Sequence, residues 1–80
     1  MNIVFSKHSL LKLGHRGISR EKVIQTLQSP DYILPSYAGR MRAYKRFDKL
    51  YLKVVFKREK GNIVVITQYW EEKFMPPKNI

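Results

Sequence analysis

The stretch that decides the fold runs from Met41 to Trp70 and reads MRAYKRFDKLYLKVVFKREKGNIVVITQYW. Two runs within it, Met41 to Phe47 and Leu50 to Lys57, are strand-like, with side chains that should alternate between two faces. Asp48-Lys49 separates them and can form a two-residue hairpin turn. The centre of the chain is therefore predicted to be a β-hairpin.

Alternation along the second run assigns its side chains to two faces of the sheet. One face is apolar and carries Leu50, Leu52, Val54 and Phe56. The other is mixed and carries Tyr51, Lys53, Val55 and Lys57. The apolar face is expected to meet other elements of the core, and the mixed face is expected to meet solvent.

Three further segments have strand character. Asn62 to Trp70 is the most apolar run, and its unbroken Val64-Val65-Ile66 predicts a central strand buried on both faces. Tyr32-Ile33-Leu34 predicts a short strand, followed by a loop over Pro35 to Gly39. Asn2 to Phe5 is compatible with a short strand or an extended lead-in.

The first part of the chain carries helix signals. Ser6 is a suitable N-cap for a helix through Leu13, with Gly14 as its left-handed stop. Ser19 can cap a second helix, which Ser29-Pro30 ends because proline disfavours the α conformation of the residue before it. The sequence thus predicts an α+β fold with two N-terminal helices packed on a three- to four-stranded antiparallel sheet.

Length and composition limit the class of protein. The chain has 80 residues, which suffice for one hydrophobic core, so we expect residues 1–80 to form a single domain. There is no cysteine to supply a disulfide or a thiolate ligand. No apolar run approaches the roughly 18 residues that a membrane span requires, and a cytoplasmic protein without a membrane partner is expected.

The charge of the chain is strongly positive and unevenly distributed. Sixteen Lys and Arg against six acids give +10. Residues 40–60 carry nine basic and two acidic residues, or +7; residues 1–39 carry five and two, or +3; residues 61–80 carry two and two, or zero. A concentrated positive segment of this kind favours binding to a polyanion, and above all to nucleic acid.

Within that segment, Arg40, Arg42, Tyr44 and Arg46 are spaced by two and should line one face of a strand. Guanidinium groups with an interleaved phenol can grip phosphates while the ring stacks on a base, as in proteins that hold single strands. The neighbouring positive residues that could extend this surface are Lys45, on the opposite face, Lys53 and Lys57. RNA is therefore the expected ligand of this surface.

Several short motifs occur in a recognisable order. They are Phe5-Ser6-Lys7-His8-Ser9, Arg16-Gly17-Ile18-Ser19, Ser29-Pro30-Asp31, the basic hairpin, and Val64-Val65-Ile66-Thr67-Gln68-Tyr69-Trp70. Together they resemble a family of small bacterial and archaeal domains related to the RelE, ParE and BrnT toxins. The resemblance covers residues 3–70.

This resemblance implies a RelE-like fold and membership of a toxin–antitoxin pair. RelE relatives cut messenger RNA, often on the ribosome and without a metal, whereas ParE relatives inhibit DNA gyrase, and fold alone does not separate these activities. Members of the family often occur with a small acidic antitoxin, which would suit the positive charge of this chain.

Metal-independent RNA cleavage needs a base for the ribose 2′-hydroxyl, cations for the charge on the phosphorane, and an acid for the leaving 5′-oxygen. His8 and Tyr69 match family positions and are the candidates for proton transfer, with Arg46 as a candidate for charge stabilisation. Arg16 also matches the family motif, and it either clamps a phosphate or ties the helix turn to a carboxylate such as Asp31. No cofactor or metal site is predicted, because two histidines, no cysteine and no cluster of acids offer no convincing ligand set.

Two other functions explain the same charge. One is a non-catalytic module that binds RNA or protein and needs no poised acid or base. The other is a ParE-like inhibitor that docks on an acidic protein surface.

Overall fold

Five strands form one mixed sheet in the computed structural model, which describes residues 2–77. The strands are β1 (Ile3–Phe5), β2 (Tyr32–Pro35), β3 (Met41–Phe47), β4 (Leu50–Glu59) and β5 (Asn62–Glu71), and their order in the sheet is β1-β5-β4-β3-β2. The hairpin of β3 and β4 confirms the predicted hairpin, and β5 continues it in antiparallel order. β4 lies at the centre of the sheet, not the more apolar β5.

The prediction of a purely antiparallel sheet of three to four strands is wrong because of β1. Its residues Ile3, Val4 and Phe5 pair in parallel with Ile63, Val64 and Val65 of β5. The backbone continues this contact on both sides, since Ile63 N donates to Asn2 O and Ser6 N donates to Val65 O. A strand of three residues whose partner lies sixty positions away leaves no local signal of its direction.

Two helices follow the predicted boundaries closely. In α1 (Lys7–His15) the Ser6 hydroxyl accepts from Ser9 N, and in α2 (Arg20–Gln28) the Ser19 hydroxyl accepts from Lys22 N. Both serines are therefore N-caps, as predicted. Gly14 lies inside α1 and does not stop it; the left-handed residue of the connection is Gly17, with φ 61°.

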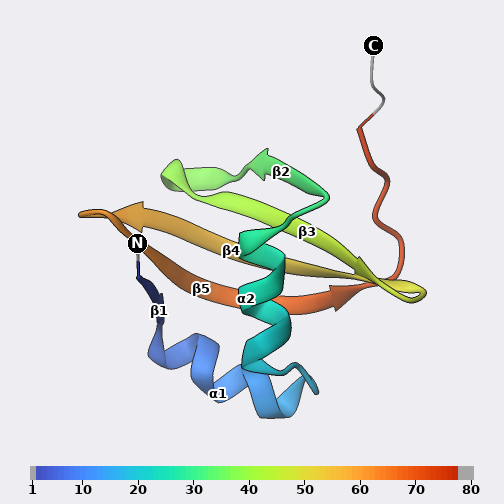
Figure 1. Ribbon diagram of the computed structural model, residues 1–80, viewed down its shortest axis with the longest axis horizontal. Coiled ribbons are helices and arrows are strands. Elements are labelled where there is room, and N and C mark those ends of the chain that lie inside the picture. The colour runs from blue at the N-terminus through green and yellow to red at the C-terminus, as the bar shows by residue number, and fades with distance from the viewer. Residues whose placement is uncertain (1, 78–80) are drawn as a thin grey trace.

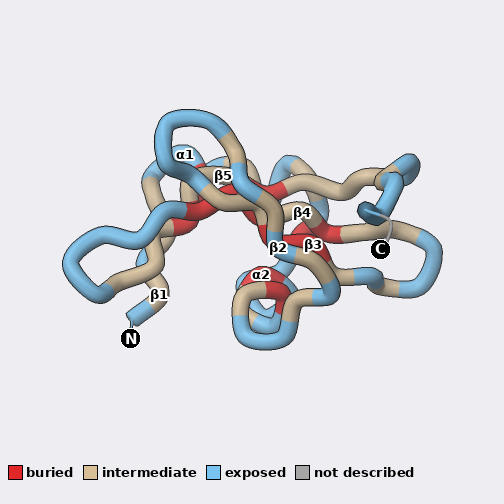
Figure 2. The backbone as a smooth tube through the Cα atoms, turned by 90° about the horizontal axis from the view of Figure 1, so that it is seen from above, coloured by how far each residue is buried: buried red, intermediate tan, exposed pale blue. Residues whose placement is uncertain are grey.

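The helices pack from one side and one edge of the sheet. Figure 1 shows α2 crossing in front of the strands while α1 runs along the side of β5. The core lies between them and contains Leu13, Ile18, Val23, Leu52, Val54 and Val65. In Figure 2 the buried residues follow the strands and the part of α2 that faces them. The part of the chain that the structure describes contains no helix long and apolar enough to cross a membrane.

The opposite side of the sheet, which we call the open face, carries the mixed side chains of the strands. Register places Tyr44, Lys53 and Tyr69 in one row across β3, β4 and β5. Because paired residues point to the same side, this row lies opposite the core residues Leu52 and Val54. Several of the candidate site residues therefore lie on the open face.

Candidate functional site

A hydrogen-bonded cluster joins α1 to the open face at the edge of β5. His8 Nε2 lies 3.2 Å from Thr67 Oγ1. Arg16 Nη1 donates to Thr67 Oγ1 at 2.9 Å and to Gln68 O at 2.9 Å. The Arg16 guanidinium also lies 5.5 Å from the centre of the Tyr69 ring. The imidazole of α1 and the guanidinium at its C-cap thus meet a hydroxyl and a phenol of β5.

Lys53 continues this cluster onto β4. Its ammonium lies 4.9 Å from the centre of the Tyr69 ring and 3.8 Å from Glu71 Oε1. Burial alone would lower the pKa of Lys53, but its interaction with the Tyr69 hydroxyl and the electrostatic influence of Tyr44, Tyr69 and Glu71 outweigh that effect and raise the pKa above 10.5. Lys53 is therefore a fixed positive charge at neutral pH.

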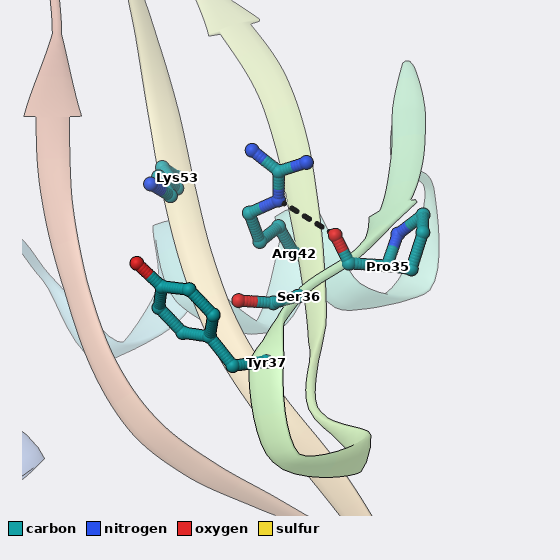
Figure 3. A pocket seen from close by; sticks show the side chains of 5 residues that line it. All are labelled: Pro35, Ser36, Tyr37, Arg42 and Lys53. Carbon is teal, nitrogen blue, oxygen red and sulfur yellow. Dashed lines mark hydrogen bonds between the residues drawn. The ribbon is translucent and has the colours of Figure 1, made fainter.

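A pocket of about 390 Å³ adjoins Lys53 on its other side. It is lined by Pro35, Ser36, Tyr37, Arg42 and Lys53. Figure 3 shows Arg42 and Lys53 projecting from their strands and Tyr37 projecting from the turn after β2, around this hollow. The pocket offers two cations, a phenol and a hydroxyl to a ligand.

The turn after β2 builds the outer wall of the pocket. Tyr37–Gly39 form a short 3-10 turn, η1, in which Ala38 adopts φ 55°. Arg42 is fixed against this turn because its Nε donates to Pro35 O at 3.0 Å, and its Nη1 donates to Tyr44 Oη at 3.3 Å. Anchoring by backbone and phenol oxygens leaves the positive charge of Arg42 uncancelled.

Arg16, Lys53 and Arg42 together form what we call the cationic row, which crosses the open face from α1 to η1. A row of fixed cations with phenols beside it can hold consecutive phosphates of a single strand. At the α1 end, His8 is exposed and adjoins the row through Thr67. The arrangement therefore brings an imidazole to one end of a row of cations.

The structure separates the arginines that we predicted to act together. Arg42 is half-buried, whereas Arg40 and Arg46 are exposed. Arg46 lies towards the β3–β4 turn, where its Nε donates to Asp48 O at 2.9 Å. Between residues 2 and 77 the ion pairs are Lys53–Glu71 and Lys57–Glu59, so carboxylates of the described chain do not neutralise these three guanidiniums.

Tyr44 does not present the exposed ring that we predicted. It is 1% exposed, and the ring of Phe74 stacks on it with centroids 3.8 Å apart and planes at 10°. Tyr44 lies between Arg42 and Arg46 on the open face as predicted, but its ring is covered by Phe74 and is not exposed between them. The reason is that the chain beyond β5 returns to the open face.

Three more predicted residues have partners within the chain. Lys45 lies on the side of α2, where its Nζ donates to Ser29 O at 2.8 Å and so satisfies a carbonyl at the end of the helix. Lys57 is exposed and pairs with Glu59 at 2.9 Å. Arg16 binds Thr67 and Gln68 O and not Asp31, whose carboxylate instead accepts from Arg46 N. Lys45 thus lies away from the cationic row.

Sequence reasoning assigned no role to Thr67, Tyr37 or Phe74. Thr67 and Tyr69 alternate along β5, so their common face was available as a signal. Tyr37 depends on the left-handed Ala38, and Phe74 follows the last strand, so no periodicity predicts where their rings lie. Among residues 2–77 no three His, Asp or Glu side chains are grouped closely enough to hold a metal ion.

Comparisons with known proteins place the chain in a structural class. A family model described as a domain of unknown function, DUF4258, matches residues 5–70. No curated protein matches the chain. Among solved structures, the fold is similar to that of the Brucella abortus ribonuclease toxin BrnT, with a TM-score of 0.71 and 18% identity over 91% of this chain and 99% of that one. The expected likeness to BrnT is thus confirmed at the level of the fold.

Proposed function

The chain belongs to the family described as a domain of unknown function, DUF4258, and from this membership we propose that it is the toxin of a toxin–antitoxin pair that cleaves messenger RNA without a metal ion. The observation that carries the proposal is the cationic row ending at His8 on the open face. The fold supports it, because BrnT, which has a similar fold, is a ribonuclease toxin.

The geometry suggests a division of roles for transesterification. His8 Nε2 takes the proton of the ribose 2′-hydroxyl, and the 2′-oxygen then forms a bond to phosphorus. The bond from phosphorus to the 5′-oxygen breaks, and the leaving oxygen takes a proton from the Tyr69 hydroxyl. The products are a 2′,3′-cyclic phosphate and a 5′-hydroxyl.

The remaining groups of the site stabilise charge and hold position. Arg16 and Lys53 lie on either side of Tyr69 and stabilise the negative phosphorane oxygens. Thr67 holds both His8 and Arg16 by its hydroxyl, so it is a positioning residue. Arg42 and the pocket beside it hold a neighbouring phosphate. Arg40 and Arg46 are exposed and extend the phosphate-binding surface beyond the row.

A small acidic protein is the proposed antitoxin. The net charge of +10 would attract such a partner, and a partner seated on the open face would block the cationic row. The chain should therefore be tolerated in cells only when an acidic partner is produced with it.

The test is cleavage of a defined messenger RNA in the presence of EDTA, with and without ribosomes. His8→Ala should lower the cleavage rate by roughly a hundredfold or more, the usual contribution of a general base. Arg20→Ala is the matched control, because Arg20 lies over Phe5 away from the open face and its loss should leave the rate unchanged. RNA that stays intact with the wild-type chain, together with normal growth on expression, would refute the toxin assignment.

A non-catalytic RNA-binding module is the second candidate. It is favoured by the hydrogen bonds that already engage His8 and Arg16 with Thr67, since a fixed surface suits binding without proton transfer. In that case His8→Ala leaves RNA binding intact and there is no cleavage to lose. Inhibition of gyrase supercoiling would instead identify a ParE-like inhibitor.

A further inference from the structure

The C-terminal tail, residues 72–77, places one aromatic side chain on the open face. The ring of Phe74 stacks on Tyr44 at 3.8 Å and 10°, and it meets Tyr32 at 5.5 Å and Tyr51 at 5.0 Å edge to face. Tyr32 and Tyr51 are themselves 6.4 Å apart. The three tyrosines form an aromatic box with Tyr44 as its floor and the other two as walls.

This ring is what holds the tail to the sheet. Within residues 2–77, the tail makes no hydrogen bond and no ion pair, and Met75 beside Phe74 is 85% exposed. Figure 1 shows the tail leaving the sheet beside the β3–β4 turn and extending away from it. Because the described residues of the tail have no hydrogen bond or ion pair to break, release of the tail from the box would mainly cost the aromatic contacts of Phe74.

The Phe74 ring lies in the box with the geometry that a stacked nucleobase would have. Nucleobases are planar rings that stack in parallel on aromatic side chains, and such stacking is a main source of affinity for single strands. The Phe74 ring lies nearly parallel to the Tyr44 ring, with the ring centres 3.8 Å apart. The tail therefore presents to Tyr44 the same flat surface that a base would.

The surroundings of the box suit the backbone of a nucleotide. The Arg42 guanidinium and the Lys53 ammonium each lie 6.0 Å from the centre of the Tyr44 ring. Both cations line the neighbouring pocket, where a phosphate can bind. A base in the box would thus have its phosphate within reach of the cationic row. If the box served only to hold the apolar Phe74 ring, it would not need these two cations beside it.

We propose that Tyr32, Tyr44 and Tyr51 form a subsite for one unpaired RNA base, and that Phe74 occupies this subsite when RNA is absent. The inference rests on the proposed function, since it assigns a base-binding role to the same open face. Binding of RNA then requires that the tail leave the box, so the tail competes with the ligand. The apparent affinity falls by the fraction of molecules in which the box is open.

The test compares two tail variants in binding to a short single-stranded RNA. Phe74→Ala empties the box and should tighten binding by roughly three- to tenfold, the factor expected from the loss of one stacked aromatic pair. Met75→Ala is the matched control and should leave the affinity unchanged, because Met75 is 85% exposed. Phe74→Trp should hold the box more firmly and weaken binding, which provides a second variant that preserves the aromatic contact.

An abasic RNA of the same length separates base recognition from phosphate recognition. Phe74→Ala should bind it no more tightly than the wild type does, because no base is present to use the box. An equal gain for intact and abasic RNA, or no gain for either, would overturn the proposed subsite. A titration with adenosine monophosphate distinguishes the two proposals: binding to Phe74→Ala that is roughly three- to tenfold tighter than to the wild type supports the box even where no RNA is cleaved.

Discussion

Lys53 is the residue at which the two halves of the site meet. On one side its ammonium contacts Tyr69 and Glu71, and on the other it lines the pocket with Arg42. Its side chain is only 14% exposed, so the charge is held in place by surrounding groups and not by solvent. Removing it would disconnect the His8 end of the row from the pocket.

The stability contributed by the charge of Lys53 should depend on pH. Because the folded-state pKa is raised above 10.5, this contribution is complete below 10.5 and is lost as the pH rises through the folded-state pKa. The difference in free energy of unfolding between the wild type and Lys53→Gln should be constant from about pH 7 to about pH 9 and then shrink at higher pH. Urea denaturation across this range measures it, and a difference that grows above 10.5 would contradict the raised pKa.

Ser9 and Gln68 connect α1 to β5 beneath the site by a buried pair of hydrogen bonds. The Ser9 hydroxyl donates to Gln68 Oε1, Gln68 Nε2 donates to Ser9 O at 3.0 Å, and both residues are 0% exposed. Ser9→Ala leaves the amide oxygen without its partner and should cost roughly 1–3 kcal/mol. Urea denaturation measures this loss, and Gln25→Ala on the exposed side of α2 is a control that should change stability by less than about 0.5 kcal/mol.

At the scale of elements, the sequence predicted the helices and strands that are specified by neighbouring residues, such as a cap or a turn. Ser6 and Ser19 cap helices, and the alternation through Asp48-Lys49 defines the hairpin. β1 was uncertain and its parallel pairing was not predicted, because Ile3–Phe5 gains its partner only from the far end of the chain. Local patterns specify elements well, but they do not specify the neighbours of a three-residue edge strand.

The site was predictable to a similar extent. Alternation correctly put Arg42 and Lys53 on one side of the sheet, and the roles proposed for His8 and Tyr69 remain predictions. What alternation could not supply was the return of Phe74 over Tyr44. Whether a residue on the open side of a strand is exposed depends also on segments outside the helices and strands, such as the tail that carries Phe74.

The turn η1 carries strain that a single substitution should relieve. Ala38 has φ 55°, a conformation that is unfavourable for a residue with a Cβ. Ala38→Gly should raise the free energy of unfolding by roughly 0.5–1 kcal/mol, and Ala38→Val should lower it, because a β-branched residue tolerates positive φ least. Urea denaturation of both variants tests this, and a loss of stability with glycine would show that the turn is not strained.

At the scale of the whole molecule, the positive charge becomes a measurable salt dependence. Arg42→Ala should weaken RNA binding uniformly across sequences and reduce the slope of log affinity against log salt by about one. Arg20→Ala removes the same charge from the side away from the open face and should leave the slope unchanged. Equal slopes for the two variants would mean that net charge, and not the cationic row, attracts RNA.

The pairing of β1 with β5 also has a consequence for folding. His8 and Thr67 are 59 positions apart in sequence, and Arg16 and Thr67 are 51 apart, yet each pair is hydrogen-bonded. Contacts between the two ends of a chain form late, because closing a long loop is entropically costly. During synthesis, the first helix must therefore wait for the last strand to emerge, and an incomplete chain lacks the hydrogen bonds that join His8 and Arg16 to Thr67.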